Sequence, residues 1–180
     1  MTKKYQVIYA DPPWRYANKP SANRTSRGFA GNHYGLMTLE EMKKFSLPTD
    51  ENCALLMWAT FPMLKQAIEL MEAWGFKYRT VAFTWHKVYK SGKDFWGCGY
   101  YTRSNNEVCL LGIKGKIKTK NHGVHQVVSS EIGRHSEKPK EIRDKIVTLL
   151  GDLPRIELFA REKTEGWDVF GNEVESDVTL

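Results

Sequence analysis

Short apolar segments, bounded by polar or turn-forming residues, limit most strongly what this chain can fold into. The first segment, Tyr5–Ala10 (YQVIYA), ends abruptly at Asp11 and the two prolines Pro12 and Pro13. A continuous apolar run of this length is typical of a strand that is buried on both faces. Four further strands are predicted over Cys53–Ala59, Tyr78–Trp85, Glu107–Ile113 and Leu153–Phe159.

Two segments with helical character lie before the third of these strands. Thr38 stands three residues before Glu41, which is the pattern of a capping box and predicts a short helix. A longer helix is predicted near Phe61–Trp74, where apolar residues recur at helical spacing. Thr60 is its expected N-cap, and Gly75 is expected to end it.

A last helix is predicted to begin at Pro139, because proline is favoured in the first turn of a helix. Ile142, Ile146 and Leu149 follow at helical spacing. Gly151 is expected to end this helix.

These segments together predict one α/β domain over residues 1–180 with a sheet covered on both faces. The segment between Tyr78–Trp85 and Glu107–Ile113 lacks helical periodicity, so these two strands are expected to pair antiparallel. The rest of the sheet is expected to be parallel. Ligands bind beyond the carboxyl ends of the strands in such sheets, which places Asp11 and Arg161 in one shared cleft.

The cysteines and histidines give neither a disulfide framework nor a metal-binding pattern. Cys53, Cys98 and Cys109 are scattered, and His122 and His125 have no carboxylate or thiol partner nearby in the sequence. We therefore predict no bound metal. Cys53 and Cys109 lie in apolar runs and are expected to be buried.

No segment has the length and hydropathy of a transmembrane helix. The first apolar run is interrupted at Asp11 and is shorter than the apolar region of a signal peptide. We therefore expect a cytoplasmic protein without a membrane partner.

The positive charge is concentrated in two stretches of the chain. The formal net charge is +6, which is compatible with a polyanionic partner. Four cations and no acid lie between Arg15 and Tyr34, and a second acid-free run holds Lys114, Lys116, Lys118 and Lys120. Either run alone is typical of a solvated loop. The two together favour contacts with phosphate groups.

The segment Asp11-Pro12-Pro13-Trp14 carries the clearest chemical meaning. The amino nitrogen of adenine is a poor nucleophile because its lone pair is delocalised into the ring. The Asp11 carboxylate and the Pro12 carbonyl can accept its two hydrogens and favour a pyramidal nitrogen, while consecutive prolines stiffen the turn. Trp14 can stack on a base withdrawn from a nucleic acid. The alternative is a rigid strand-end turn with a tryptophan in the core.

From about Tyr5 to about Val174, the chain resembles the mRNA adenosine methyltransferase (MT-A, seventy-kilodalton subunit) family, in a compact microbial or phage form. The motifs that carry the resemblance are Asp11-Pro12-Pro13-Trp14, His33-Tyr34-Gly35-Leu36-Met37-Thr38, Leu55-Leu56-Met57-Trp58, Asn106-Glu107, His135-Ser136-Glu137-Lys138-Pro139, Glu157-Leu158-Phe159-Ala160-Arg161 and Gly171-Asn172. The resemblance implies a Rossmann-like, S-adenosylmethionine-dependent methyltransferase fold. Its order is circularly permuted, with the catalytic motif before the cofactor motif.

The resemblance also implies roles for individual residues. The catalytic residues would be Asp11, Pro12, Pro13 and Trp14. S-adenosylmethionine would be bound by Asp11, Lys138, Glu157, Arg161, Asn172 and Glu173, with Lys138 on its carboxylate and Arg161 and Asn172 near its ribose. The chain departs from the family at Glu173 and at Glu162-Lys163, where other polar residues are usual.

Aromatic and basic residues in two loops are expected to hold the nucleic acid by stacking and by phosphate contacts. The substrate-binding residues that we predict are Arg15, Tyr16, Arg27, His33, Tyr34, Trp96, Arg103, Asn106 and Glu107. For any one of these aromatics, the alternative is ordinary packing of a loop against the sheet.

The sequence thus predicts direct, in-line methyl transfer from S-adenosylmethionine to the adenine amino group of DNA. RNA adenine methylation with the same residues is the first alternative. A catalytically silent nucleic-acid-binding subunit is the second, and a cytosine or glutamine amino methyltransferase is a weaker one. The expected partners are a nucleic acid and, since the chain is short, a second copy in a homodimer.

Overall fold

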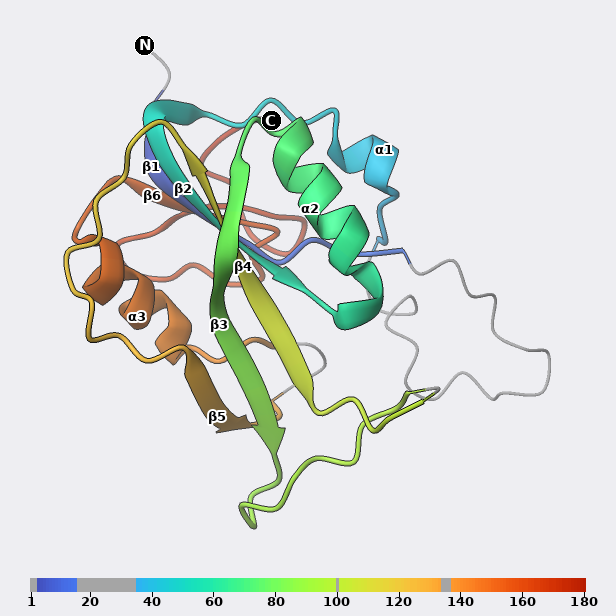
Figure 1. The fold of residues 1–180 in the computed structure, drawn as a ribbon. Helices are drawn as coiled ribbons and strands as arrows, with labels where there is room; N and C mark the ends of the chain where they lie inside the picture. The colour runs from blue at the N-terminus through green and yellow to red at the C-terminus, as the bar shows by residue number, and fades with distance from the viewer. Residues whose placement is uncertain (1–2, 16–34, 100, 134–136) are drawn as a thin grey trace.

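The computed structural model describes residues 3–15, 35–99, 101–133 and 137–180 (Figure 1). Within these ranges the strands are β1 (Tyr5–Ala10), β2 (Thr49–Ala59), β3 (Lys77–Val88), β4 (Asn106–Lys114), β5 (Val127–Glu131), β6 (Arg155–Leu158) and β7 (Asp168–Phe170). The helices are α1 (Leu39–Met42), α2 (Leu64–Ala73) and α3 (Glu141–Leu150), and a 3₁₀ turn, η2 (Phe61–Met63), leads into α2.

The described strands form one sheet in the order β5-β3-β4-β2-β1-β6-β7. β4 pairs antiparallel with both β2 and β3, and every other pair is parallel. All strands except β4 therefore end at one edge of the sheet, which is also the edge where β4 begins. This arrangement confirms the predicted α/β methyltransferase-type fold, with a mostly parallel sheet and an antiparallel element.

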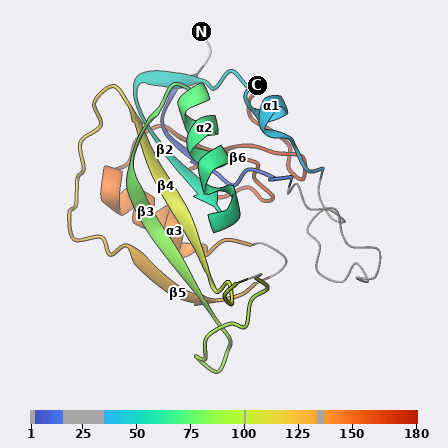
Figure 2. The same ribbon diagram turned by 45° about the vertical axis from the view of Figure 1, so that its right-hand side comes forward.

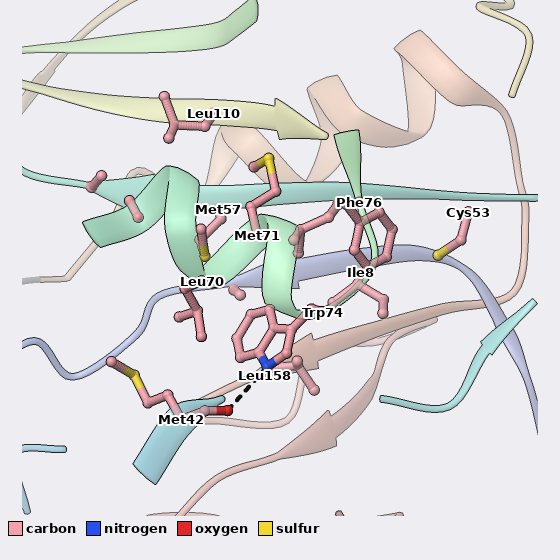
Figure 3. Close-up of a cluster of buried hydrophobic side chains, with 14 of the residues drawn as sticks. Ile8, Met42, Cys53, Met57, Leu70, Met71, Trp74, Phe76, Leu110 and Leu158 are labelled. Carbon is pink, nitrogen blue, oxygen red and sulfur yellow. Dashed lines mark hydrogen bonds between the residues drawn. The ribbon is translucent and has the colours of Figure 1, made fainter. Parts of the chain in front are cut away.

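The helices cover both faces of the sheet, as Figures 1 and 2 show. α1 and α2 lie on one face, where Leu70 and Met71 of α2 pack with Ile8 of β1 and Met57 of β2 (Figure 3). The indole nitrogen of Trp74 donates a hydrogen bond to the backbone carbonyl of Met42 at 3.0 Å and ties the end of α2 to α1. Every second residue along a strand packs on this face, because successive side chains of a strand point to opposite faces of the sheet.

α3 covers the opposite face, where it packs with Tyr9 of β1 and Trp58 of β2. Its fully buried residues are Ile142, Ile146 and Leu150, whereas Leu149 is only partly buried. Leu149 packs against the same cluster as these residues, and Leu150 is the more deeply buried of the two leucines.

The capping box at Thr38 and Glu41 is confirmed, with both of its hydrogen bonds present. The predicted helix over Phe61–Trp74 is corrected, because it begins with a 3₁₀ turn and becomes α-helical only at Leu64. Thr60 precedes that turn, but its side chain does not cap it.

The strand predicted over Leu153–Phe159 is shorter, because Phe159 has a φ of 62° and leaves the extended conformation there. β5 and β7 were not anticipated, since both are short and carry few apolar residues. Cys53 and Cys109 are buried, as predicted, whereas Cys98 is exposed.

Within the described residues, no helix is both long enough and apolar enough to cross a membrane.

Candidate active site

Two adjoining cavities, of about 260 and 560 Å³, open at the edge where the parallel strands end. Their shared wall is formed by Asp11, Lys138, Phe159, Arg161 and Glu173. Asp11 follows β1 directly, and Arg161 follows β6, so the two neighbouring strands deliver both side chains to this wall. The prediction of one shared cleft for Asp11 and Arg161 is confirmed.

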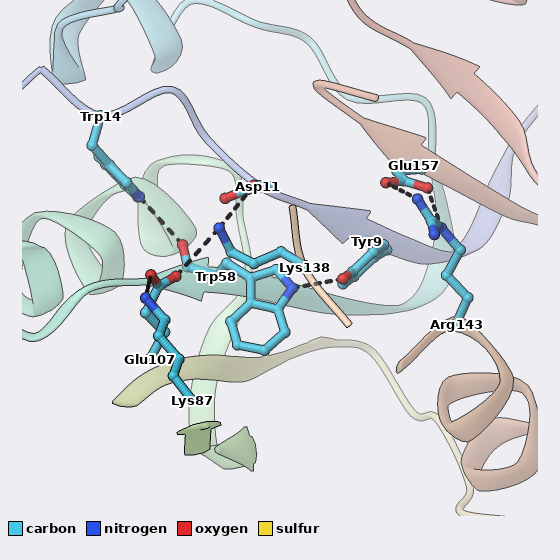
Figure 4. A network of polar contacts seen from close by, with 9 residues as sticks. All are labelled: Tyr9, Asp11, Trp14, Trp58, Lys87, Glu107, Lys138, Arg143 and Glu157. Atoms are coloured by element: carbon cyan, nitrogen blue, oxygen red, sulfur yellow. Dashed lines mark hydrogen bonds and ion pairs between the residues drawn. The ribbon is translucent and has the colours of Figure 1, made fainter. Parts of the chain in front are cut away.

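Four charged side chains of alternating sign form a continuous chain that begins in the wall of the smaller cavity and ends at Lys87 behind it (Figure 4). The ammonium of Lys138 lies 2.9 Å from Oδ2 of Asp11 and 3.2 Å from Oε2 of Glu107. The other carboxylate oxygen of Glu107 accepts a hydrogen bond from Nζ of Lys87. The side chains of Lys138 and Glu107 are each only 10% exposed, so these two buried charges are compensated by each other and by their outer partners Asp11 and Lys87.

Burial and the neighbouring charges shift the pKa values of these groups in opposite directions. Burial raises the pKa of the Asp11 carboxyl, although the charge of Lys138 opposes that rise. Burial would also raise the pKa of Glu107, but Lys138 and Lys87 together hold it below its usual range. The pKa of Lys138 is raised, because its two carboxylate partners outweigh the effect of burial. Lys138 and Glu107 are therefore both charged at neutral pH.

Two tryptophans, Trp14 and Trp58, line the smaller cavity beside these charged side chains. The indole nitrogen of Trp14 donates to the backbone carbonyl of Trp58 at 3.3 Å, and the indole nitrogen of Trp58 donates to the hydroxyl of Tyr9 at 2.6 Å. Nζ of Lys138 lies 5.7 Å from the ring centroid of Trp58, within cation–π range. Trp14 is only 6% exposed, so most of its ring packs in the core while the remainder lines the smaller cavity.

The turn after β1 is held by its own backbone. The carbonyl of Pro12 accepts from the amide of Trp14 at 2.9 Å, and the carbonyl of Pro13 accepts from the amide of Met37 at 2.9 Å. The amide of Arg15 in turn donates to the carbonyl of Met37 at 3.2 Å. A carbonyl oxygen has two lone pairs, so Pro12 keeps one acceptor position beyond its bond to Trp14.

The larger cavity is bordered by a buried ion pair between α3 and β6. Nε and Nη2 of Arg143 donate to the two carboxylate oxygens of Glu157 at 2.7 and 2.9 Å, which is a bidentate arrangement (Figure 4). Burial raises the pKa of Glu157, and the guanidinium of Arg143 opposes that rise. Both oxygens of Glu157 are thus used within the protein, and its carboxylate shapes the cavity wall.

The connection from β6 to β7 brings the last cavity residues into place. The amide of Ala160 donates to the carbonyl of Phe170 at 3.0 Å, and Gly171 packs against the backbone of Ala160. A Cβ at position 171 would overlap the carbonyl oxygen of Ala160, so this close approach requires glycine. Asn172 and Glu173 follow directly and line the smaller cavity.

All the residues predicted to bind the cofactor line one cavity or both, namely Asp11, Lys138, Glu157, Arg161, Asn172 and Glu173. Asp11 does so as a partly buried carboxylate, 24% exposed and paired with Lys138. These placements leave their roles as predictions.

The residues predicted to bind the substrate are less closely grouped. Glu107 lines the smaller cavity, and Asn106 precedes it in β4. Arg15 donates to the backbone carbonyl of Leu36 at 3.2 Å. Trp96 and Arg103 lie in the segment between β3 and β4 and line neither cavity. Tyr16, Arg27, His33 and Tyr34 lie outside the described residues.

Sequence reasoning missed Lys87, Tyr9 and Arg143. Lys87 shares a sheet face with Glu107 because β3 and β4 pair with Trp85 opposite Glu107. The alternation of side chains along β3 decides on which face of the sheet Lys87 lies. The register that brings Lys87 to Glu107 has no local sequence signal.

The basic run Lys114–Lys120 lies away from the two cavities, and its predicted phosphate contacts stay a prediction. It follows the end of β4, whereas the cavities lie at the beginning of that strand. A strand of this length spans about 25–30 Å, so this run lies at the opposite edge of the sheet.

Comparison with known proteins places the chain among methyltransferases. The MT-A70 family model matches residues 5–173. The type II methyltransferase M.MunI of Mycoplasma sp is 39% identical over 189 aligned residues, which cover 96% of this chain and 78% of that protein. The human N(6)-adenosine-methyltransferase catalytic subunit METTL3 is 27% identical over 96% of this chain but only 28% of its own length. The Drosophila melanogaster MT-A70-like protein is likewise 27% identical, over 27% of its length.

The chain spans about a quarter of the length of its animal relatives and most of the length of its mycoplasmal one. The match to the family model covers nearly all of the described sheet together with both cavities. This chain therefore belongs to the MT-A70 family of methyltransferases.

Proposed function

We propose that this chain transfers a methyl group from S-adenosylmethionine to the exocyclic amino nitrogen of adenine in DNA. The observation that carries the proposal is the Asp11 carboxylate, which stands at the wall between two cavities and is oriented there by Lys138. One cavity can hold the base and the other the methyl donor, with the reacting atoms meeting beside Asp11. The names of the mycoplasmal and human relatives support the reaction type.

The side chains around the cavities fit S-adenosylmethionine chemically. Lys138 and Arg161 are cations suited to a carboxylate and to hydroxyl oxygens, and Asn172 and Glu173 can hydrogen-bond a ribose or an adenine amine. The larger cavity, of about 560 Å³, is within the usual size range of small-molecule sites, and the smaller one adjoins it. When bound, S-adenosylmethionine supplies a methyl group on a positively charged sulfur.

The protein's own contribution is positioning and hydrogen bonding. Asp11 and the free acceptor position of Pro12 would take the two amino hydrogens of adenine, which directs the nitrogen lone pair outward. The exposed part of Trp14 would support the base. These steps form no covalent bond to the protein.

We favour DNA over RNA on the basis of the match to the type II methyltransferase. Among the relatives compared, this protein has the higher identity to the chain and is the one matched over most of its length. The test is mass spectrometry of nucleosides after the wild-type protein is incubated with S-adenosylmethionine and either DNA or RNA. N6-methyladenine in DNA is the expected product. N6-methyladenine in RNA alone would identify RNA as the substrate instead. No product despite cofactor binding would favour a catalytically silent subunit.

We expect the Lys138→Ala variant to bind S-adenosylmethionine about tenfold or more weakly, because a hydrogen bond to a charged group contributes about 1.5–3 kcal/mol. Isothermal titration calorimetry would measure the dissociation constant. Lys43→Ala is the matched control, since Lys43 pairs with Glu40 and Glu69 on the surface of the helices and lines neither cavity. An unchanged dissociation constant for Lys138→Ala would remove Lys138 from the cofactor site.

The pH profile of kcat/KM for a DNA substrate should fall on its acid side at a pKa above the usual value of about 3.9 for aspartate, because transfer requires ionised Asp11. The charge of Glu107 helps to raise the pKa of Asp11. Glu107→Gln should therefore lower that pKa and move the acid limb to lower pH. An acid limb that stays in place, or moves up, would contradict the assignment of this limb to Asp11.

A further inference from the structure

Exposed aromatic side chains gather in the segment that joins β3 to β4, residues 89–105. Trp96 is 69% exposed, Tyr101 is fully exposed, and Tyr89 is also exposed. The segment leaves β3 at the edge where the cavities open and returns into β4 at Asn106, directly before Glu107 of the smaller cavity. Figures 1 and 2 show it projecting beyond the sheet at that edge. Exposed aromatic groups concentrated in a segment that leads into a cavity wall indicate a binding surface.

The base of this segment is tied to the sheet. The ring of His86 in β3 hydrogen-bonds Asp94 at 2.9 Å and Ser129 of β5 at 3.1 Å. The amide of Phe95 donates to the carbonyl of Lys87 at 3.0 Å. The rings of Tyr89 and Phe95 pack edge to face with centroids 5.3 Å apart. Trp96 is thus presented from an anchored backbone, which lowers the entropy lost when a ligand binds it.

Two glycines bring the arms of the segment together. A Cβ at Gly97 would overlap the carbonyl of Ser104, and a Cβ at Gly99 would overlap the carbonyl of Thr102. Because the arms can approach this closely, the guanidinium of Arg103 lies 5.1 Å from the ring centroid of Trp96. The pair forms a cation–π contact while most of the indole surface remains exposed.

The charge of the segment is complementary to a polyanion. Lys90, Lys93 and Arg103 are exposed cations. Asp94 is the acidic residue of the segment, and its carboxylate is paired with His86. An aromatic ring flanked by cations is the combination that holds unpaired bases and their phosphates.

We propose that Trp96 and Arg103 form a stacking platform for the nucleobase next to the target adenine. This inference rests on the proposed function, because withdrawing the adenine from its stack exposes one face of each neighbouring base. Trp96 covers such a face, and Arg103 contacts the adjoining phosphate. The substrate class is therefore a DNA strand with a base beside the adenine that can be unstacked, rather than an isolated adenine nucleotide.

The test compares two single-stranded DNA oligonucleotides that each contain one adenine. In the first the adenine has a normal base on either side, and in the second both neighbouring positions are abasic. Fluorescence anisotropy with labelled oligonucleotides gives the dissociation constants of wild type, Trp96→Ala and Trp96→Phe. Nucleoside mass spectrometry measures methylation of both oligonucleotides by the same proteins.

Trp96→Ala should bind the normal oligonucleotide about 5- to 100-fold more weakly than wild type, the range expected for loss of one stacked base. Trp96→Phe should recover most of that loss. On the abasic oligonucleotide, wild type and Trp96→Ala should bind within about twofold of each other, because the stacking partner of Trp96 is missing.

Equal losses on both oligonucleotides would show that Trp96 only supports the loop, and would overturn the platform. Wild-type methylation with no loss in Trp96→Ala would overturn the platform and leave the proposed function standing. No binding or methylation by the wild type itself would overturn both. A self-association that sedimentation shows to depend on Trp96 would reassign the surface to a second copy of the chain.

Discussion

Replacement of Asp11 by alanine is expected to lower the rate of methyl transfer by about 10²- to 10³-fold or more, as loss of a hydrogen-bonding group at a reacting centre does. The carboxylate is the group that would accept a hydrogen of the adenine amine, and it lies where the two cavities meet. The fold should survive, because Asp11 lies beyond the last residue of β1 and keeps 24% of its side chain exposed. Lys138 retains Glu107 as a partner at 3.2 Å, so its ammonium is not left unpaired.

Single-turnover methylation of a DNA oligonucleotide, with the product nucleosides measured by mass spectrometry, would test this expectation. Glu69→Ala is the matched control, since Glu69 is also a carboxylate paired with a lysine but lies on α2 away from both cavities. Circular dichroism and the melting temperature would establish that both variants are folded. Turnover of Asp11→Ala at the wild-type rate would refute the proposed mechanism.

Replacement of Arg143 by methionine is expected to destabilise the protein by about 3–5 kcal/mol, the range seen when one partner of a buried ion pair is removed. The side chains of Arg143 and Glu157 are only 13% and 9% exposed, and Arg143 binds both oxygens of the carboxylate. Without Arg143 the charge of Glu157 would remain buried with no guanidinium to compensate it. Urea denaturation would give the change in the free energy of unfolding.

The loss of stability in Arg143→Met should depend on pH. Burial already raises the pKa of folded Glu157, and removal of Arg143 raises it further. A carboxyl with a raised folded pKa favours the folded state fully below its unfolded pKa of about 4.3, and that contribution is lost as the pH rises through the folded pKa. The destabilisation of Arg143→Met should therefore be largest at neutral pH and shrink as the pH falls.

Two further variants sharpen this test. Arg143→Met combined with Glu157→Gln should recover part of the lost stability, because no buried charge remains. Lys163→Met removes an ion pair with Asp177 that is about half exposed on the lysine side, and should change the stability little, because solvent screens exposed pairs. A loss for Arg143→Met as small as that of Lys163→Met would mean that the buried pair contributes little.

Much of the fold could be predicted from local patterns. The strand over Tyr5–Ala10 and the capping box at Thr38 were predicted with their observed positions. Each depends on neighbouring residues only, through a continuous apolar run or through a side-chain bond to a nearby amide. β5 and β7 escaped prediction because their pairing with longer strands, rather than their own composition, holds them extended.

Local sequence patterns were enough to predict that Asp11 follows a buried strand and shares a cleft with Arg161. Both conclusions need only the end points of apolar runs and the rule that parallel strands end at one edge. The sequence also contains the motif Asp11-Pro12-Pro13-Trp14, whose chemistry suits an adenine amine.

The three-dimensional packing of distant segments sets which groups surround Asp11. Lys138 reaches its carboxylate across 127 positions of the chain, and Lys87 reaches Glu107 through the register between β3 and β4. It also decided that the basic run Lys114–Lys120 lies at the far edge of the sheet. Strand order and register are fixed by the packing of the whole sheet and its helices, so no short segment of sequence carries them.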